Sequence, residues 1–208
     1  GGMIGNKRAC SFGDISTTSF FPAKPLGCYG DGGAVFTDND EWAALADSYR
    51  VHGKGMFKYD NVRIGMNSRL DTLQAAILKI KFKAFREYEL RDINKAAALY
   101  TGKLSGKVKT PVISEGYYSS WAQYTIRLDS KEERDALQTR LKEQGIPSMV
   151  YYPTPMHGQT AYKTLNISDD CCPTAKQLCD TVLSLPVHPY ITEEEIETVC
   201  SVILGFVR

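Results

Sequence analysis

The stretch that decides the interpretation of this chain runs from Ser11 to Gly33 and reads SFGDISTTSFFPAKPLGCYGDGG. Ser16 to Phe21 is rich in β-branched and aromatic residues, which favours a strand. The apolar run Gly33 to Thr37, directly after a glycine cluster, favours a second short strand. We therefore expect two paired strands joined by the loop between them.

Lys24 lies in that loop, just after the first strand and between Pro22 and Pro25. Both prolines restrict the backbone, so the lysine is held on a stiff segment. A desolvated lysine amine that has lost its proton is the nucleophile that Schiff-base chemistry requires. Ser19, at the same end of the strand, offers a hydroxyl suited to a phosphate oxygen. A lysine beside prolines is more often an ordinary solvated loop residue, so the assignment depends on the order of the surrounding residues.

Four blocks of sequence carry that order. The first is S-F-x-x-x-K-P-L-G-x-x-G-D-G-G over residues 19–33, and the second is Val62 to Ile77. The third is Tyr152 to His157 followed by Tyr162, and the fourth is Leu183 to Pro189. In this order they closely resemble the DegT/DnrJ/EryC1/StrS family of sugar aminotransferases, which are pyridoxal-phosphate enzymes of fold type I.

The resemblance implies an α/β chain that corresponds to the C-terminal part of a fold type I transferase. Residues 1–104 would be the remainder of the large cofactor-binding domain with its long connecting helix, and residues 105–208 a small α+β domain. The glycines and the proline between residues 102 and 116 mark this boundary. Gly1-Gly2 resembles the tail of the block that carries the acid on the pyridine nitrogen, so we expect the chain to be N-terminally truncated and weakly active or inactive by itself.

The resemblance also implies roles for residues of the first two blocks. Lys24 would be the catalytic residue, bonding covalently to the cofactor and then moving the proton, and Ser19 would hold the cofactor phosphate. Asn67 would reach the phosphate of the cofactor in the neighbouring subunit. Arg69 would contact an anionic part of the sugar nucleotide, with a local salt bridge at the helix start as its alternative.

Two residues of the third block, Tyr152 and His157, resemble positions that line the sugar pocket. For His157 a purely structural hydrogen bond is an equal alternative. Among the glycines of the first block, Gly30, Gly32 and Gly33 are expected to take backbone angles closed to other residues. The chain has three scattered histidines and no paired ligand spacing, so no metal site is expected.

The activity that follows from the resemblance is transfer of an amino group from glutamate, through pyridoxal 5'-phosphate, to the keto sugar of a nucleotide-linked sugar. The segments 52–55 and 58–63 most resemble enzymes that act on UDP-2-acetamido-3-keto-glucuronate in bacterial surface-polysaccharide (lipopolysaccharide) biosynthesis. A UDP-4-keto-6-deoxy sugar is the competing substrate. The enzyme would be a homodimer with sites shared across its interface. The alternative is a catalytically inactive fragment that acts only as a dimerisation or interaction module around Asn67 and Arg69.

Composition is consistent with this interpretation. The chain has 208 residues, 43% of them hydrophobic, and its 25 basic and 24 acidic residues give a net charge of +1. The basic residues are scattered among acids, which argues against nucleic-acid binding. No apolar run is long enough to span a membrane, and the N-terminus has no secretory signal. The six cysteines form no CxxC pair, so we expect reduced, mostly buried thiols and a cytoplasmic location.

Hydrophobic periodicity predicts the remaining elements. Asn39 and its acidic neighbours offer a cap for the first helix, a polar loop follows from His52 to Asn67, and Ser130 and Thr192 are expected to cap two later helices. The helix from residue 70 is either one long helix or two with a kink. The expected helices lie at 42–49, 70–99, 131–145, 175–183 and 193–203, and the expected strands at 121–128 and 147–152.

Overall fold

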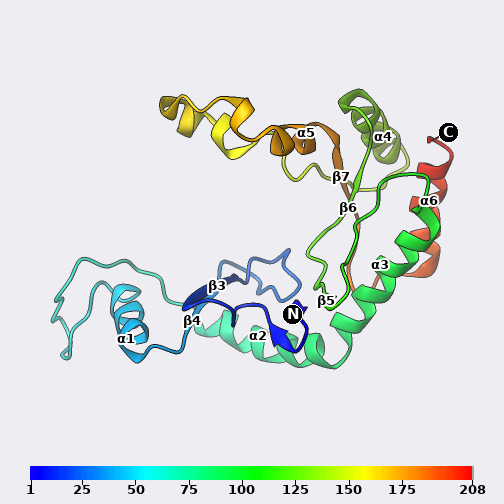
Figure 1. Ribbon diagram of the computed structural model, residues 1–208. Coiled ribbons are helices and arrows are strands. Elements are labelled where there is room, and N and C mark those ends of the chain that lie inside the picture. Colours follow the sequence, from blue (N-terminus) through cyan, green and yellow to red (C-terminus); the bar gives the residue numbers. More distant parts are fainter. Residues whose placement is uncertain (208) are drawn as a thin grey trace. The chain divides into compact units, whose positions relative to one another are not determined.

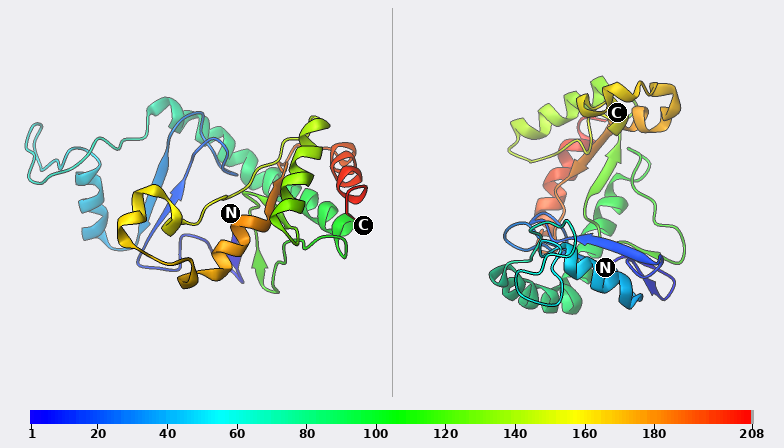
Figure 2. Two further views of the ribbon diagram at one scale, coloured as in Figure 1. Left: turned by 90° about the horizontal axis from the view of Figure 1, so that it is seen from above. Right: turned by 90° about the vertical axis from the view of Figure 1, so that its left-hand side faces the viewer.

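The computed structural model describes residues 1–207 and divides into two compact units (Figure 1 and Figure 2). The first comprises Gly1–Leu90 with Ser114–Ser120, and the second comprises Arg91–Ile113 with the chain from Trp121 onward. Both units combine helices with short antiparallel strands. The domain boundary between residues 104 and 105 stays a prediction.

The first unit contains the expected strand pair. Strand β3 (Ile15–Ser19) runs antiparallel to β4 (Gly33–Thr37), and their register pairs Ser19 with Gly33 at the loop end. This confirms the predicted hairpin. A second, three-stranded sheet has β1 (Met3–Ile4) between β2 (Lys7–Arg8) and β5 (Tyr117–Tyr118), and the sequence did not predict it because two-residue strands carry no readable alternation.

The helices between residues 40 and 104 follow the predicted order. Helix α1 (Asp40–Tyr49) is capped by Asn39, whose side-chain oxygen accepts the N–H of Trp42 at 3.0 Å. After the polar loop, α2 (Thr72–Ala84) passes into a π-helical turn η1 (Phe85–Glu89) and then into α3 (Leu90–Leu104). The predicted long helix is therefore present as three consecutive helical segments, of which the middle one is a π turn.

The second unit has a two-stranded sheet covered by helices. Strand β6 (Tyr124–Arg127) pairs antiparallel with β7 (Val182–Leu185). The helices are α3 from Arg91 onward, α4 (Lys131–Glu143), α5 (Pro173–Thr181) and α6 (Glu193–Leu204). Its fully buried side chains include Tyr100, Leu104, Tyr124, Ile126, Leu137, Leu141, Leu183, Ile196 and Ile203. The caps predicted at Ser130 and Thr192 are confirmed, because each side chain accepts the N–H of the glutamate three residues later.

Two predictions in the second unit are wrong. Residues 147–152 do not form a strand: only Met149 bridges to Ser184, and Pro147 has no N–H to donate to a ladder. The helix predicted to reach residue 183 ends at Thr181, and Leu183 belongs to β7. All four residues of β7 are buried, so its sequence shows no alternation that would separate it from a buried helix end.

Between Met149 and α5 the chain forms three short 3-10 helices. They are η2 (Met156–Gly158), η3 (Thr160–Leu165) and η4 (Asp169–Cys171). Within the described residues, no helix combines the length and apolar character that crossing a membrane requires. All six cysteines are free thiols, and three of them, Cys28, Cys179 and Cys200, are buried.

Candidate functional site

Ser19 and Lys24 lie on one tight turn at the end of β3. The N–H of Phe21 donates to Ser19 Oγ at 3.1 Å, and the N–H of Lys24 donates to the carbonyl oxygen of Phe21 at 2.8 Å. The peptide groups of Phe21 therefore link the two predicted residues. We name residues 20–32, which join β3 to β4, the lysine loop.

Lys24 is not desolvated in the way considered from the sequence, but its amine is left without a partner among the described residues. Lys24 is exposed, and within residues 1–207 its side chain makes no hydrogen bond, ion pair or cation–π contact. Ser19 Oγ uses a lone pair to accept the Phe21 N–H, so its own hydroxyl proton is left to donate to an anion. An unengaged primary amine five positions after a serine with a free hydroxyl proton fits the aldehyde and the phosphate of pyridoxal phosphate.

The lysine loop is closely packed against itself. The buried thiol of Cys28 lies 3.0 Å from the carbonyl oxygens of both Phe20 and Gly30, and the N–H of Cys28 donates to the Phe20 oxygen at 2.8 Å. A Cβ atom on Gly27 would stand 2.6 Å from the carbonyl oxygens of Phe21 and Pro22. Only glycine therefore allows the loop to return across the turn that carries Lys24.

The reason predicted for Gly30, Gly32 and Gly33 is wrong. None of the three has a positive φ, so unusual backbone angles do not explain them. Space explains two of them instead, because a Cβ on Gly32 would lie 2.9 Å from a methyl group of Leu70, and one on Gly33 would lie 2.8 Å from the carbonyl oxygen of Thr18. The glycines let backbone and side chains approach closely.

Asn67 and Arg69 form a second polar group in the same unit. Arg69 donates from Nε to Asn67 Oδ1 at 3.1 Å, and both side chains are exposed. Asn67 itself sits opposite Val51 in an antiparallel bridge that closes the polar loop. No carboxylate of the described residues lies within salt-bridge distance of Arg69, so the amide of Asn67 orients its guanidinium and leaves the Nη groups free.

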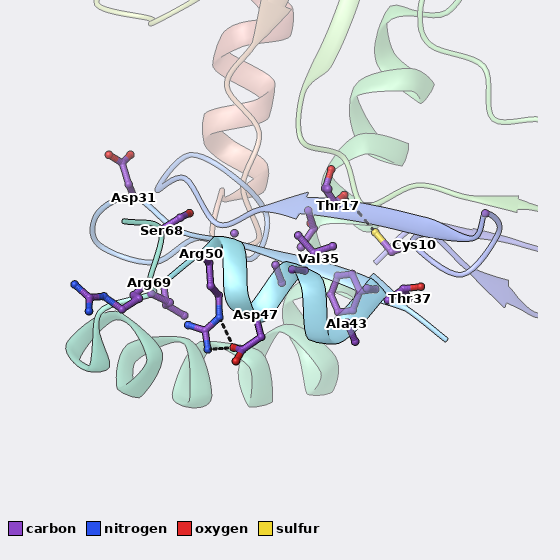
Figure 3. A pocket seen from close by; sticks show the side chains of 18 of the residues that line it. Cys10, Thr17, Asp31, Val35, Thr37, Ala43, Asp47, Arg50, Ser68 and Arg69 are labelled. Atoms are coloured by element: carbon purple, nitrogen blue, oxygen red, sulfur yellow. Dashed lines mark hydrogen bonds and ion pairs between the residues drawn. The ribbon is translucent and has the colours of Figure 1, made fainter. Parts of the chain in front are cut away.

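A pocket of about 1180 Å³ lies beside this pair, between the β3–β4 hairpin, α1 and residues 67–70 (Figure 3). Arg69 and Ser68 line it together with Asp31, and Arg50 is held there by a salt bridge of 2.5 Å to Asp47. Ser19 and Lys24 are not among its lining residues. The lysine loop nevertheless contributes to the pocket, because its residues 31 and 32 are among the lining residues.

Tyr152 and His157 belong to the second unit. Tyr152 is 64% exposed, and its ring meets that of Tyr151 edge to face at 5.4 Å. His157 is different, because its side chain is only 9% exposed and its Nε2 lies 2.9 Å from Asp169 Oδ1. That contact joins η2 to η4, which is the structural hydrogen bond considered for this histidine, whereas substrate contact by either residue stays a prediction.

Comparison with known proteins supports the resemblance that the four sequence blocks indicate. The model of the DegT/DnrJ/EryC1/StrS aminotransferase family matches residues 1–204. A UDP-2-acetamido-2-deoxy-3-oxo-D-glucuronate aminotransferase of Pseudomonas aeruginosa is 41% identical over 204 residues, which are 97% of this chain and 54% of that protein. A protein of Geobacillus stearothermophilus named pleiotropic regulatory protein is also 41% identical, over 100% of this chain and 56% of its own length.

Solved structures show the same relationship. A DegT/DnrJ/EryC1/StrS aminotransferase from Brucella abortus superimposes with a TM-score of 0.93 at 45% identity, covering 99% of this chain and 54% of that one. The predicted fold class, an α/β chain related to fold type I transferases, is thereby confirmed. The chain spans about half the length of the relatives it matches.

Proposed function

This chain belongs to the DegT/DnrJ/EryC1/StrS aminotransferase family, and we propose on that premise that the protein transfers an amino group from glutamate to the keto sugar of a nucleotide-linked sugar. The observation that carries the proposal is the tight turn from Ser19 to Lys24 at the end of β3, which we call the lysine turn. It presents the Lys24 amine without a competing partner among the described residues, five positions after a serine whose hydroxyl proton is free to donate. Pyridoxal phosphate fits this donor set.

When bound, pyridoxal phosphate supplies an electron sink that allows the amino group to pass between an amino acid and a carbonyl compound. The chain's own residues would do the rest. Ser19 would hold the phosphate by donating its hydroxyl proton, and Lys24 would anchor the cofactor covalently. Once released, the Lys24 amine would remove a proton from the donor substrate and return one to the sugar carbon.

Arg69 would recognise an anionic group of the sugar nucleotide. Its guanidinium is oriented by Asn67 through Nε, and the remaining N–H groups form a fork that matches phosphate or carboxylate oxygens. Asn67 keeps its amide N–H₂ group, which would donate to the cofactor phosphate of a second subunit. A homodimer with sites shared across the interface is part of this proposal, and in it Asn67 would be both a ligand and the support of Arg69.

The substrate that we favour is UDP-2-acetamido-3-keto-glucuronate, with a UDP-4-keto-6-deoxy sugar as the alternative. Support comes from segments 52–55 and 58–63 and from the Pseudomonas aeruginosa relative, whose name states a UDP-linked 3-oxo-glucuronate substrate. Tyr152 and His157 would line the sugar pocket. A role in bacterial surface-polysaccharide biosynthesis, including lipopolysaccharide, follows from this substrate class as part of the proposal.

The test is covalent trapping of the cofactor. The chain is incubated with pyridoxal phosphate, reduced with borohydride, and mapped by mass spectrometry of its peptides. We expect the pyridoxyl group on Lys24, its loss in Lys24→Arg, and its retention in the control Lys58→Arg, which changes an exposed lysine outside the loop. Labelling spread equally over many lysines and unchanged in Lys24→Arg would refute the proposal. Amino transfer from glutamate is then assayed with both sugar nucleotides.

A second candidate is an interaction module without catalytic activity. The Geobacillus stearothermophilus relative supports it, because its name describes a regulatory protein at the same identity as the aminotransferase relative. Under this hypothesis the surface around Asn67 and Arg69 would mediate self-association. It predicts that Lys24→Arg leaves both cofactor labelling and the oligomeric state unchanged, whereas Arg69→Ala changes the oligomeric state.

A further inference from the structure

We infer that Gln74 is a positioning residue for Lys24: from helix α2 it holds the lysine loop in the conformation that presents the lysine amine. The inference rests on the proposed function and deepens it. Gln74 lies in the second sequence block, seven positions after Asn67, and none of the roles assigned above involves it.

The contact is a single long-range hydrogen bond. The backbone N–H of Tyr29 donates to Gln74 Oε1 at 2.8 Å and joins residues 45 positions apart in the chain. Within the described residues, the other hydrogen bonds of the lysine loop run inside the loop or to the adjoining strand residues. Among the described residues, Gln74 is therefore the α2 side chain that hydrogen-bonds to the loop.

The surroundings show that this contact is built into the loop. A Cβ on Gly30 would lie 3.1 Å from Gln74 Nε2, so the loop backbone passes directly over the amide. Lys81, two turns further along α2, places its Nζ 5.5 Å from the centre of the Tyr29 ring and adds a weaker cation–π contact. Both ends of the Tyr29 residue, its backbone and its ring, thus meet the same helix.

The consequence for Lys24 follows from the packing of the loop. Tyr29 adjoins Cys28, whose buried thiol and N–H connect to the carbonyl oxygen of Phe20. Gly27, one residue earlier, touches the backbone of the turn that carries Lys24. A displacement of Tyr29 is therefore passed through closely packed backbone to the lysine turn. Helix α2 begins at Thr72, three residues after Arg69, so the helix that bonds to the lysine loop also follows the Asn67–Arg69 pair in the chain.

The test compares Gln74→Leu, Gln74→Glu and the control Lys79→Ala in the full chain. Leucine removes the acceptor, glutamate keeps an oxygen acceptor for the Tyr29 N–H, and Lys79 is an exposed residue of α2 without a side-chain partner in residues 1–207. Hydrogen exchange of the peptide that contains residues 24–30 and borohydride trapping at Lys24 are measured in each. Stability to urea is recorded to verify that the variants are folded.

We expect Gln74→Leu to speed exchange of the Tyr29 amide about fivefold, the change that corresponds to loss of one hydrogen bond of ~1 kcal/mol. Trapping at Lys24 should fall at least roughly twofold, because the held conformation becomes less populated. Gln74→Glu should restore both values, and Lys79→Ala should match the unaltered chain. A role confined to global stability would not be rescued at the lysine in this way.

The outcomes separate this inference from the proposed function. Trapping at Lys24 in the unaltered chain together with equal exchange and equal trapping in Gln74→Leu would overturn the role of Gln74 and leave the proposed function intact. Absence of Lys24 trapping in the unaltered chain would overturn the proposed function, and with it the role of Gln74 toward the cofactor. Faster exchange with unchanged trapping would show that Gln74 holds the loop without positioning the lysine, which also overturns the inference.

Discussion

Substituting Gly27 by alanine should disable the lysine turn while leaving most of the chain folded. The added Cβ would lie 2.6 Å from the carbonyl oxygens of Phe21 and Pro22, and 2.9 Å from the carbonyl carbon of Pro22. An ordinary contact needs about 3.4 Å or more, so the backbone of the turn must move by roughly 0.8 Å. The Phe21 oxygen also accepts the N–H of Lys24, so this movement falls on the bond that closes the turn.

The expected cost of Gly27→Ala is about 1–3 kcal/mol of unfolding free energy, the usual range for overpacking, measured by urea denaturation. Trapping of pyridoxal phosphate at Lys24 should fall by at least about tenfold, because displacements near 1 Å at a reacting group cost up to ~100-fold. Gly102→Ala is the matched control. Gly102 lies in α3 with nothing within 4 Å of an added Cβ, so the same change there should stabilise by about 0.5–1 kcal/mol.

Two results would refute this reasoning. If Gly27→Ala is as stable as the unaltered chain and traps the cofactor equally well, the close approach of Gly27 does not constrain the lysine turn. If Gly102→Ala lowers trapping as much as Gly27→Ala does, the effect is not local to the loop.

The remaining predictions concern the second unit. Arg134 is 3% exposed, and its Nη1 donates to the carbonyl oxygens of Cys179 and Val182, where α5 ends and β7 begins. Arg134→Met should therefore lower the free energy of unfolding by about 3–5 kcal/mol, measured by urea denaturation. Asp135→Asn, which changes only the half-exposed partner of Arg134, should cost less than about 1 kcal/mol, and equal losses in both variants would contradict the prediction. Burial raises the pKa of the Cys200 thiol to about 11, so a thiol-reactive disulfide at pH 8 should modify the exposed Cys171 and Cys172 quickly and Cys200 only after unfolding. Modification of Cys200 as fast as Cys171 in the folded chain would contradict this prediction. Because the folded-state pKa of Cys200 lies above the ordinary value, the contribution of Cys200 to the free energy of unfolding is present below about pH 9 and is lost as the pH rises toward 11.

Sequence patterns predicted the elements whose signals are local. The caps at Asn39, Ser130 and Thr192 needed only a short polar side chain before a helix. The β3–β4 hairpin needed a run of β-branched and aromatic residues, a glycine cluster and an apolar run. Strand β7 was missed because a strand buried on both faces has no alternation to read. The strand expected at residues 147–152 does not form, because only Met149 of this segment makes a bridge to β7.

The site residues also include some that the sequence indicates and others that only the structure shows. By itself the sequence determined the family, through four ordered blocks, and it determined that a lysine flanked by prolines follows a strand end. Only the tertiary structure decided what holds that lysine, because the contacts concerned join residues far apart in the chain. Gln74 bonds to Tyr29 across 45 positions, and Gly32 is a glycine because Leu70 occupies the space beside it. Such contacts depend on where the backbone returns in space, and no local pattern of residue types records that.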